Sequence, residues 1–228
     1  MPDRIAFLQH SPSDLPGLLG EFAADLGLDV AVHRPDLGAA ALPAADGFDL
    51  LVVMGSIESV YDTSVPWIAP ERALVAGAVD TGVPVLGVCF GGQLLAEVLG
   101  GSVARGERTE LGWVPVRTTD PDRVLAGPWL NWHDDVISCP PDAEPLATSD
   151  LALQAFVQGV HTGVQFHPEV TVEVVHAWID DARDRHGVAD EDVEALLAGF
   201  DEGGRGAEAQ ARALFTGFLS RAGRLPGA

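Results

Sequence analysis

Apolar runs and amphipathic stretches alternate along the first hundred residues of the chain. Turn residues bound most of the apolar runs, which predict strands at 4–9, 29–33, 48–54 and 83–88. The stretches between and after them have the spacing of helices with one apolar face, at 18–26, 68–80 and 93–99. Strands that are apolar along most of their length and alternate with helices are typical of a mainly parallel sheet covered on both faces.

The pattern changes after Gly101. Shorter alternating segments, such as 113–117 and 153–157, predict antiparallel strands that extend the same sheet to about residue 166. Helical periodicity then returns in three segments, at 172–185, 190–199 and 207–219. We expect the run Gly203-Gly204-Arg205-Gly206 to separate the last two helices. The whole pattern predicts a single α/β domain with a central mixed, mostly parallel sheet flanked by helices.

Composition narrows the range of functions. The 228 residues are enough for one such domain, and 47% of them are hydrophobic and can form its core. The formal net charge is −21, and all 13 basic residues are arginines. The absence of lysine excludes Schiff-base chemistry on a lysine and the lysine of a P-loop. The negative charge argues against binding to nucleic acid or to an anionic membrane.

The sequence further predicts a cytoplasmic protein with no cofactor and no metal site. The N-terminus lacks the layout of a signal peptide, and no apolar run approaches the roughly 20 residues needed to span a bilayer. Cys89 and Cys139 lie in different contexts, so we do not expect a disulfide framework. The histidines form no His-Glu-x-x-His motif, and we interpret Cys139 as an incidental thiol on a loop.

The segment Gly87-Val88-Cys89-Phe90-Gly91 joins a predicted strand to a predicted helix. This is the context of a nucleophile elbow, a turn so tight that the residues around it must be small. Such a turn projects its central side chain over the edge of the sheet. The thiol then lies at a helix N-terminus, where free N–H groups favour a thiolate. The alternative is a buried structural cysteine, and the segment alone does not decide between them.

A second candidate lies downstream, in Gln165-Phe166-His167-Pro168-Glu169. Proline pushes the residue before it toward an extended conformation, in which side chains two positions apart point the same way. Glu169 can therefore orient the imidazole of His167 while the other side of the ring faces a nucleophile. Taken alone, this tripeptide is equally well a chance surface turn, and only its combination with Cys89 favours catalysis.

Together these motifs resemble class I glutamine amidotransferases, which use a Cys-His-Glu triad. The resemblance extends over roughly residues 4–170, and it is closest to stand-alone domains similar to the amidotransferase half of GMP synthase. It implies a flavodoxin-like fold, with a domain at 1–170 and a helical C-terminal extension at 171–228 packed on it. The segments that carry the resemblance are 54–62, 85–96, 99–101, 132–136 and 164–169.

The resemblance implies a role for each triad residue. Cys89 would attack the side-chain amide of glutamine and form a γ-glutamyl thioester. His167, oriented by Glu169, would protonate the leaving ammonia and then activate water, so that glutamate is released. No synthetase or nucleotide loop is found in these residues to use the ammonia, so we expect an ATP-dependent synthetase in trans as partner.

The resemblance also implies an oxyanion hole and a substrate site. The backbone N–H of Phe90 would supply one donor, and the loop at Gly55-Ser56 another. Gln93 takes a glutamine-contacting position, and the backbone of Asp134 and Asp135 would hold the amino-acid end of the substrate.

Two departures from the family pattern leave alternatives open. The oxyanion loop reads Gly55-Ser56-Ile57 where relatives commonly have Gly-Gly-Pro, and Asp134 stands where they carry a small residue. The loop would then close only on ligand, and the added carboxylate would either meet the substrate ammonium or exclude free glutamine. One alternative function is therefore a γ-glutamyl peptide or conjugate hydrolase or transferase that uses the same triad. Another is a catalytically silent binding or regulatory module, against which the intact triad argues.

Overall fold

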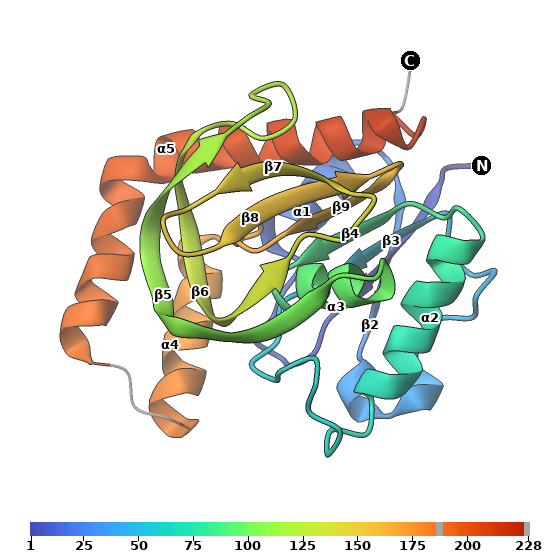
Figure 1. Cartoon of the computed structure of the whole chain (residues 1–228), viewed down its shortest axis with the longest axis horizontal. Helices are drawn as coiled ribbons and strands as arrows, with labels where there is room; N and C mark the ends of the chain where they lie inside the picture. Colours follow the sequence, from blue (N-terminus) through green and yellow to red (C-terminus); the bar gives the residue numbers. More distant parts are fainter. Residues whose placement is uncertain (186–188, 226–228) are drawn as a thin grey trace.

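The computed structural model describes residues 1–185 and 189–225, without the side chains of 184–185 and 201–205. Within these residues the chain forms a nine-stranded sheet in the order β2-β1-β3-β4-β9-β8-β7-β5-β6 (Figure 1). The strands are β1 (Arg4–Leu8), β2 (Asp29–His33), β3 (Leu50–Val53), β4 (Val85–Val88), β5 (Ser102–Thr118), β6 (Gly127–Ser138), β7 (Glu144–Thr148), β8 (Leu153–Gln158) and β9 (His161–Val164). The helices are α1 (Gly17–Asp25), α2 (Ile68–Asp80), α3 (Phe90–Val98), α4 (Val172–Arg185) and α5 (Asp190–Arg221), with short 3-10 turns at Pro35–Leu37 and Ala39–Ala41.

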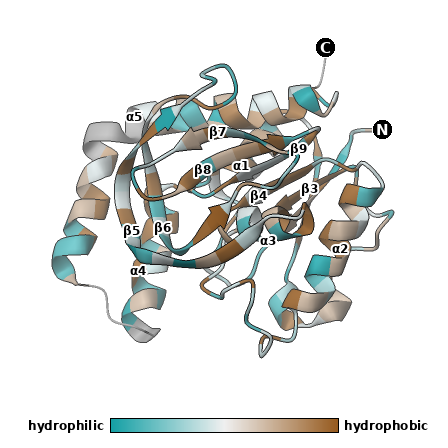
Figure 2. Cartoon of the chain, viewed as in Figure 1, coloured by the Kyte–Doolittle hydropathy of each residue, from teal (hydrophilic) through white to brown (hydrophobic). Residues whose placement is uncertain are grey.

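The first half of the sheet is parallel. β1 pairs in parallel with β2 and β3, β3 with β4, and β4 with β9. Every residue of β3 and β4 is buried, because helices cover both faces. α1 and the second half of α5 pack on one face, and α2 and α3 pack on the other. Figure 2 shows the consequence, with these central strands among the most apolar parts of the molecule.

The second half of the sheet is antiparallel, as the alternating pattern after Gly101 predicts. β9 returns antiparallel to β8, β8 to β7, and β7 to the end of β5. β5 and β6 form a long hairpin whose register shifts between Arg105 and Glu110. The predicted strand at 113–117 is thus only part of β5. The central mixed sheet flanked by helices confirms the predicted fold class. It is not mostly parallel as predicted, because in the described part of the chain four of its strand pairings are parallel and four are antiparallel.

The predicted break in the last helix is wrong. α5 runs continuously from Asp190 to Arg221, through the glycine-rich run at 203–206. Figure 1 shows its axis changing direction between the orange and the red half, and paired glycines are a common cause of such bends. Each glycine weakens a helix by about 1 kcal/mol relative to alanine, which does not end a helix anchored on both sides. Val193 and Leu196 pack with α4, and Leu214 and Phe218 are buried in the main core.

Candidate active site

Four neighbouring parallel strands end at the same edge of the sheet, and each is followed by a residue of the candidate site. His10 follows β1, Gly55 follows β3, Cys89 follows β4, and His167 follows β9. The carboxyl ends of parallel strands are where open α/β sheets usually hold their ligands. The strand order therefore brings together residues that are far apart in the sequence.

Cys89 occupies the sharp turn that the sequence predicts. Its φ is 49° and its ψ −108°, and no other non-glycine residue in the described part of the chain has a positive φ. α3 begins at the next residue rather than at 93, so Gly91 and Gly92 lie in its first turn. A Cβ atom on Gly91 would lie 2.1 Å from the carbonyl oxygen of Val53, and one on Gly92 would lie 2.5 Å from that of Val164. The helix can begin this close to β3 and β9 only because these residues lack side chains.

His167 and Glu169 make the contact that their spacing predicts. The Nδ1 atom of His167 lies 2.8 Å from a carboxylate oxygen of Glu169, and both side chains are buried. Nε2 is also buried and makes no hydrogen bond among the described residues, and the thiol of Cys89 is close enough to affect the ring. Burial opposes protonation of this ring, but the charges of Glu169 and Cys89 outweigh it and raise the pKa of His167 well above its ordinary value. The arrangement favours a protonated imidazole held beside the sulfur of Cys89.

Further contacts fix the ring and the thiol. Trp178 of α4 meets the imidazole of His167 edge to face, with ring centroids 4.7 Å apart. The amide Nε2 of Gln165 lies 3.6 Å from the sulfur of Cys89, and its Oε1 accepts a hydrogen bond of 3.3 Å from Gln93. Gln93 thus reaches the site from the first turns of α3, through Gln165.

The loop after β3 lies directly against the reacting groups. A Cβ atom on Gly55 would lie 3.1 Å from Cε1 of His167 and 3.8 Å from Cβ of Cys89. A side chain at this position would crowd the imidazole of His167. Ser56 is not among the residues with positive φ. The loop as folded therefore does not force Ser56 into the left-handed conformation that favours glycine.

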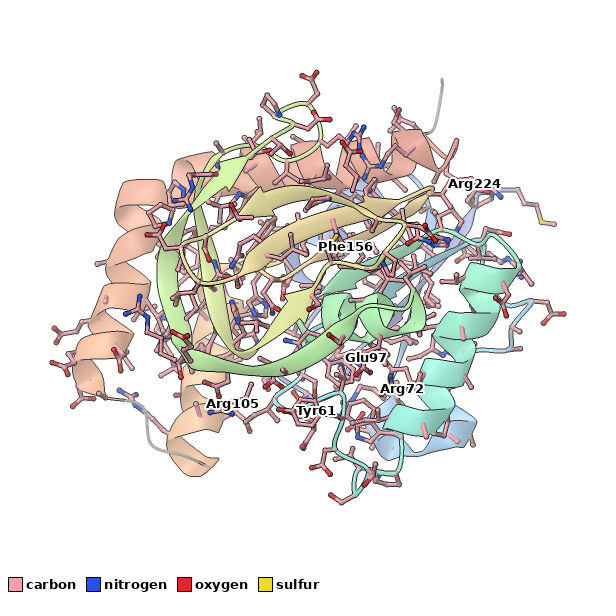
Figure 3. The ribbon with its side chains drawn as sticks, viewed as in Figure 1. Tyr61, Arg72, Glu97, Arg105, Phe156 and Arg224 are labelled. Atoms are coloured by element: carbon pink, nitrogen blue, oxygen red, sulfur yellow. The ribbon has the colours of Figure 1, made fainter. Side chains whose placement is uncertain are left out.

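The two aspartates of β6 are both engaged with the protein. The carboxylate of Asp135 accepts hydrogen bonds from the hydroxyls of Ser59 (2.6 Å) and Tyr61 (2.8 Å), which ties the loop after β3 to β6. Asp134 pairs with Arg105 at 3.1 Å and accepts a hydrogen bond from Thr109. Figure 3 shows Tyr61 and Arg105 on the same lower side of the molecule in this view.

A second buried histidine–glutamate pair supports this segment. Nδ1 of His133 lies 2.9 Å from the carbonyl oxygen of Asp135, and its Nε2 lies 3.0 Å from Glu110 of β5. Burial would raise the pKa of Glu110, but hydrogen bonds from His133, Ser149 and Gln154 lower it overall. The pair holds the backbone at the segment expected to receive the amino-acid end of a substrate.

One cavity of about 590 Å³ joins these groups. Eight of the nine residues that the sequence nominated line it, the exception being Phe90, which was nominated for its backbone N–H: Gly55, Ser56, Cys89, Gln93, Asp134, Asp135, His167 and Glu169. The cavity extends to α4 and to the start of α5, where Trp178, Ala182 and Asp192 line it. Burial raises the pKa of Asp14, another residue of the lining.

Sequence reasoning missed several residues that hold the site. His10, Glu71, Glu110 and Gln154 carry no motif, and their partners are distant in the sequence. His10 lies 61 residues from Glu71, to which its imidazole is hydrogen-bonded. The available signal for His10 was its position just beyond the first predicted strand, at the edge where Cys89 was expected.

The α/β sheet thus places a cysteine at an elbow and a buried histidine–glutamate pair at its carboxyl edge. The model of the family "Glutamine amidotransferase class-I" matches residues 19–181. The chain belongs to the class I glutamine amidotransferase family.

Individual relatives agree with this assignment. The glutamine amidotransferase-like protein YfeJ of Salmonella typhimurium is 31% identical over 192 residues, which cover 77% of this chain and 80% of that protein. One subunit of the glutamine-hydrolyzing GMP synthase of Sulfurisphaera tokodaii is 46% identical over 158 residues, covering 64% of this chain and 78% of that polypeptide. The GMP synthase of Vibrio atlanticus is 36% identical over 132 residues, but the match covers only 24% of that longer protein.

Solved structures show the same fold. The crystal structure of a glutamine amidotransferase from Methylobacillus flagellatus superposes with a TM-score of 0.88 at 26% identity, over 97% of this chain and 96% of that one. Within the described residues no helix is long and apolar enough to cross a membrane. The same residues contain no group of three or more histidine, cysteine, aspartate or glutamate side chains that could hold a metal ion.

Proposed function

We propose that the chain hydrolyses the side-chain amide of glutamine through a thioester on Cys89. The observation that carries the proposal is the buried pair of His167 and Glu169 at 2.8 Å, with the thiol of Cys89, held at an elbow, beside the same ring. Family membership supports the same chemistry.

In the first half of the reaction the Cys89 thiolate attacks the carbonyl carbon of the amide. Negative charge develops on the carbonyl oxygen and is stabilised by the backbone N–H groups of Phe90 and Ser56. The imidazolium of His167 gives its proton to the amide nitrogen, the carbon–nitrogen bond breaks, and ammonia leaves the γ-glutamyl thioester. Glu169 keeps the ring in position and stabilises its charged form.

In the second half the neutral His167 accepts a proton from a water molecule. The hydroxide attacks the thioester, the carbon–sulfur bond breaks, and glutamate leaves as the thiolate forms again. Gln93 and the backbone at Asp134 and Asp135 hold the amino-acid end of the substrate. Arg105 reduces the negative charge that Asp134 adds beside that end.

Replacing the sulfur tests the proposal directly. We expect Cys89→Ala to keep the fold and to abolish release of ammonia and glutamate, because the variant lacks the atom that attacks the amide. Cys139→Ala is the matched control and should retain activity, because that thiol lies in the loop after β6 and contacts the carbonyl oxygen of Ala143. Glutamine hydrolysis by Cys89→Ala at the wild-type rate would refute the proposal.

The ammonia is used by an ATP-dependent synthetase acting in trans. One relative that supports this is named as a subunit of a GMP synthase. Purification of the tagged chain from its native host, followed by mass spectrometry, should recover such an enzyme. Consistent recovery of the chain alone, with full glutaminase activity, would contradict this part of the proposal.

A γ-glutamyl peptide or conjugate is the second candidate substrate, and the size of the cavity favours it. A volume of about 590 Å³ lies in the range of sites for ligands much larger than free glutamine. Turnover of glutamine should be compared with that of γ-glutamyl dipeptides, with the isomeric α-glutamyl dipeptides as controls. A higher kcat/KM for the γ-linked dipeptides than for glutamine would favour the second candidate, and the reverse order would favour the first.

A further inference from the structure

A buried histidine lies behind the loop that follows β3. Nδ1 of His10 is 2.7 Å from the carbonyl oxygen of Gly55, and Nε2 is 2.9 Å from a carboxylate oxygen of Glu71 in the first turn of α2. The side chains of His10 and Glu71 are both 0% exposed. Neither residue lines the cavity, so His10 can act on the site only through the residues that it contacts.

This hydrogen bond fixes the orientation of one peptide group. A carbonyl oxygen only accepts, so Nδ1 of His10 carries the proton and donates it to Gly55. The described residues contain no cis peptide bond, and in a trans peptide the C=O and N–H groups point in opposite directions. With the carbonyl of Gly55 turned toward His10, the N–H of Ser56 points away from His10.

Gly55 lies between His10 and the reacting groups. A Cβ atom there would lie 3.1 Å from the imidazole of His167 and 3.8 Å from Cβ of Cys89. His10 holds the same residue from the buried side, through its carbonyl oxygen. The peptide that follows Gly55 is therefore held between a buried anchor and the space in which the carbonyl oxygen of a substrate must lie.

His10 also packs against the other segment expected to supply a donor. Its ring meets the ring of Phe90 edge to face at 4.9 Å and stacks on Trp67 at 4.8 Å. The backbone N–H of Phe90 is the second donor in the proposed reaction. One side chain thus contacts both segments of the oxyanion hole.

Glu71 holds the ring of His10 in place. Burial alone would lower the pKa of His10, but the charge of Glu71 and its hydrogen bond raise this pKa above the ordinary value. Both ring nitrogens then donate, one to the carboxylate and one to the carbonyl. A buried ion pair is a poor source of stability by itself, since the desolvation of both charges offsets their attraction. Its position behind the loop points to a role in geometry.

We propose that His10, held by Glu71, is a positioning residue that fixes the Gly55–Ser56 peptide with its N–H directed at the oxyanion formed on the substrate. The inference rests on the proposed function, because it assigns a task within that reaction. It adds a residue that never touches the substrate to the set that determines the rate.

Two variants of similar size separate the two hydrogen bonds of the ring. His10→Asn places an amide nitrogen near the position of Nδ1 and keeps the donor to Gly55, but it cannot reach Glu71. His10→Gln places its amide nitrogen near the position of Nε2, keeps the contact with Glu71, and loses the donor to Gly55. We expect His10→Asn to retain kcat within about threefold. We expect His10→Gln to lower kcat and kcat/KM together by about 10- to 100-fold with KM unchanged, as for a lost transition-state interaction.

A second readout distinguishes positioning from damage to the fold. Alkylation of Cys89 by iodoacetamide needs the thiolate but forms no oxyanion. Its rate, followed by mass spectrometry, should therefore stay within about twofold of wild type in both variants. The double variants His10→Asn/Glu71→Gln and His10→Gln/Glu71→Gln leave no buried charge unpaired, and they give the same comparison if a single variant is unstable.

The outcomes are distinct. Wild-type activity in His10→Gln, a change confined to KM, or a parallel loss of alkylation would overturn the positioning role and leave the proposed function standing. A wild-type protein that turns over neither glutamine nor γ-glutamyl substrates would overturn both.

Discussion

At the scale of single residues, Cys89 is the one non-glycine residue in the described part of the chain whose φ is positive. A non-glycine residue at φ 49° and ψ −108° costs about 1–3 kcal/mol, which the surrounding packing must offset. The gain is that the sulfur projects toward His167 while the backbone turns from β4 into α3. The sequence already indicated this turn, because Gly87 and Gly91 lie on either side of Cys89 and a tight turn needs small neighbours.

Glu169 sets the pH range in which His167 is protonated. The pKa of His167 is raised in the folded protein, so its imidazolium, and with it the activity, should be lost only as the pH rises through that raised value. Replacing Glu169 with glutamine removes the largest of the causes that raise this pKa. The alkaline limb of the kcat/KM profile should therefore move to lower pH by about one unit or more. The remaining activity should also fall by at least about tenfold, because the neutral amide no longer stabilises the charged ring.

The control for this prediction removes a carboxylate that does not contact the ring. Glu173 is exposed on α4, and Glu173→Gln should leave the pH profile of wild type unchanged. An alkaline limb in Glu169→Gln at the wild-type pH would show that another group sets it.

At the scale of elements, the elbow depends on how closely the first turn of α3 approaches β3 and β9. Gly91→Ala would place a methyl group 2.1 Å from the carbonyl oxygen of Val53, and neither backbone can move without disturbing β3 and β4. We expect the free energy of unfolding to fall by about 1–3 kcal/mol or more, as for other overpacked sites, with loss of activity. Urea unfolding followed by circular dichroism measures the change.

A second glycine offers the matched comparison. Gly77 is exposed in the interior of α2, and a Cβ atom there would have nothing within 4 Å. Gly77→Ala should stabilise the protein by about 0.5–1 kcal/mol through helix propensity alone. Equal effects of the two substitutions would mean that steric contact at the elbow does not determine the role of Gly91.

The helices after Pro168 show how tertiary contacts override local propensity. The glycine-rich run at 203–206 predicts an end to the helix. α5 nevertheless continues, because each of its halves packs on a different part of the protein. Its second half contributes Leu214, Phe215, Phe218 and Leu219 to the main core, each at most 1% exposed. α4 meanwhile places Trp178 against His167. The C-terminal helices therefore serve both the core and the candidate site.

Charge is the dominant property at the scale of the whole molecule. The negative charges of the compact protein repel one another, because the formal net charge is −21. The ion pairs of arginine with aspartate or glutamate are mostly at the surface, and each contributes little to stability. Added salt screens the long-range repulsion. The midpoint of thermal unfolding should therefore rise by several degrees between low salt and about 0.5 M sodium chloride.

Potassium chloride at the same ionic strength should give the same rise, because screening does not depend on which monovalent cation is present. A midpoint that falls with salt would instead mean that the ion pairs, such as Arg72–Glu97 and Arg123–Glu144, outweigh the repulsion.

The amino-acid sequence by itself determined those features that depend on residues close together in the chain. Strand and helix periodicity, the glycines around Cys89, and the spacing of His167 and Glu169 each depend on a few consecutive residues, and the alternation of elements predicts the sheet. Only the tertiary structure decided which distant groups meet. His10 reaches Gly55 and Glu71, and Asp135 reaches Tyr61, because β1, β3 and β4 are neighbours and the β5–β6 hairpin folds back over their ends. Such contacts join residues 45 to 74 positions apart, so no local pattern specifies them. Their geometry is set by the strand order and by the need of buried polar groups for hydrogen-bond partners.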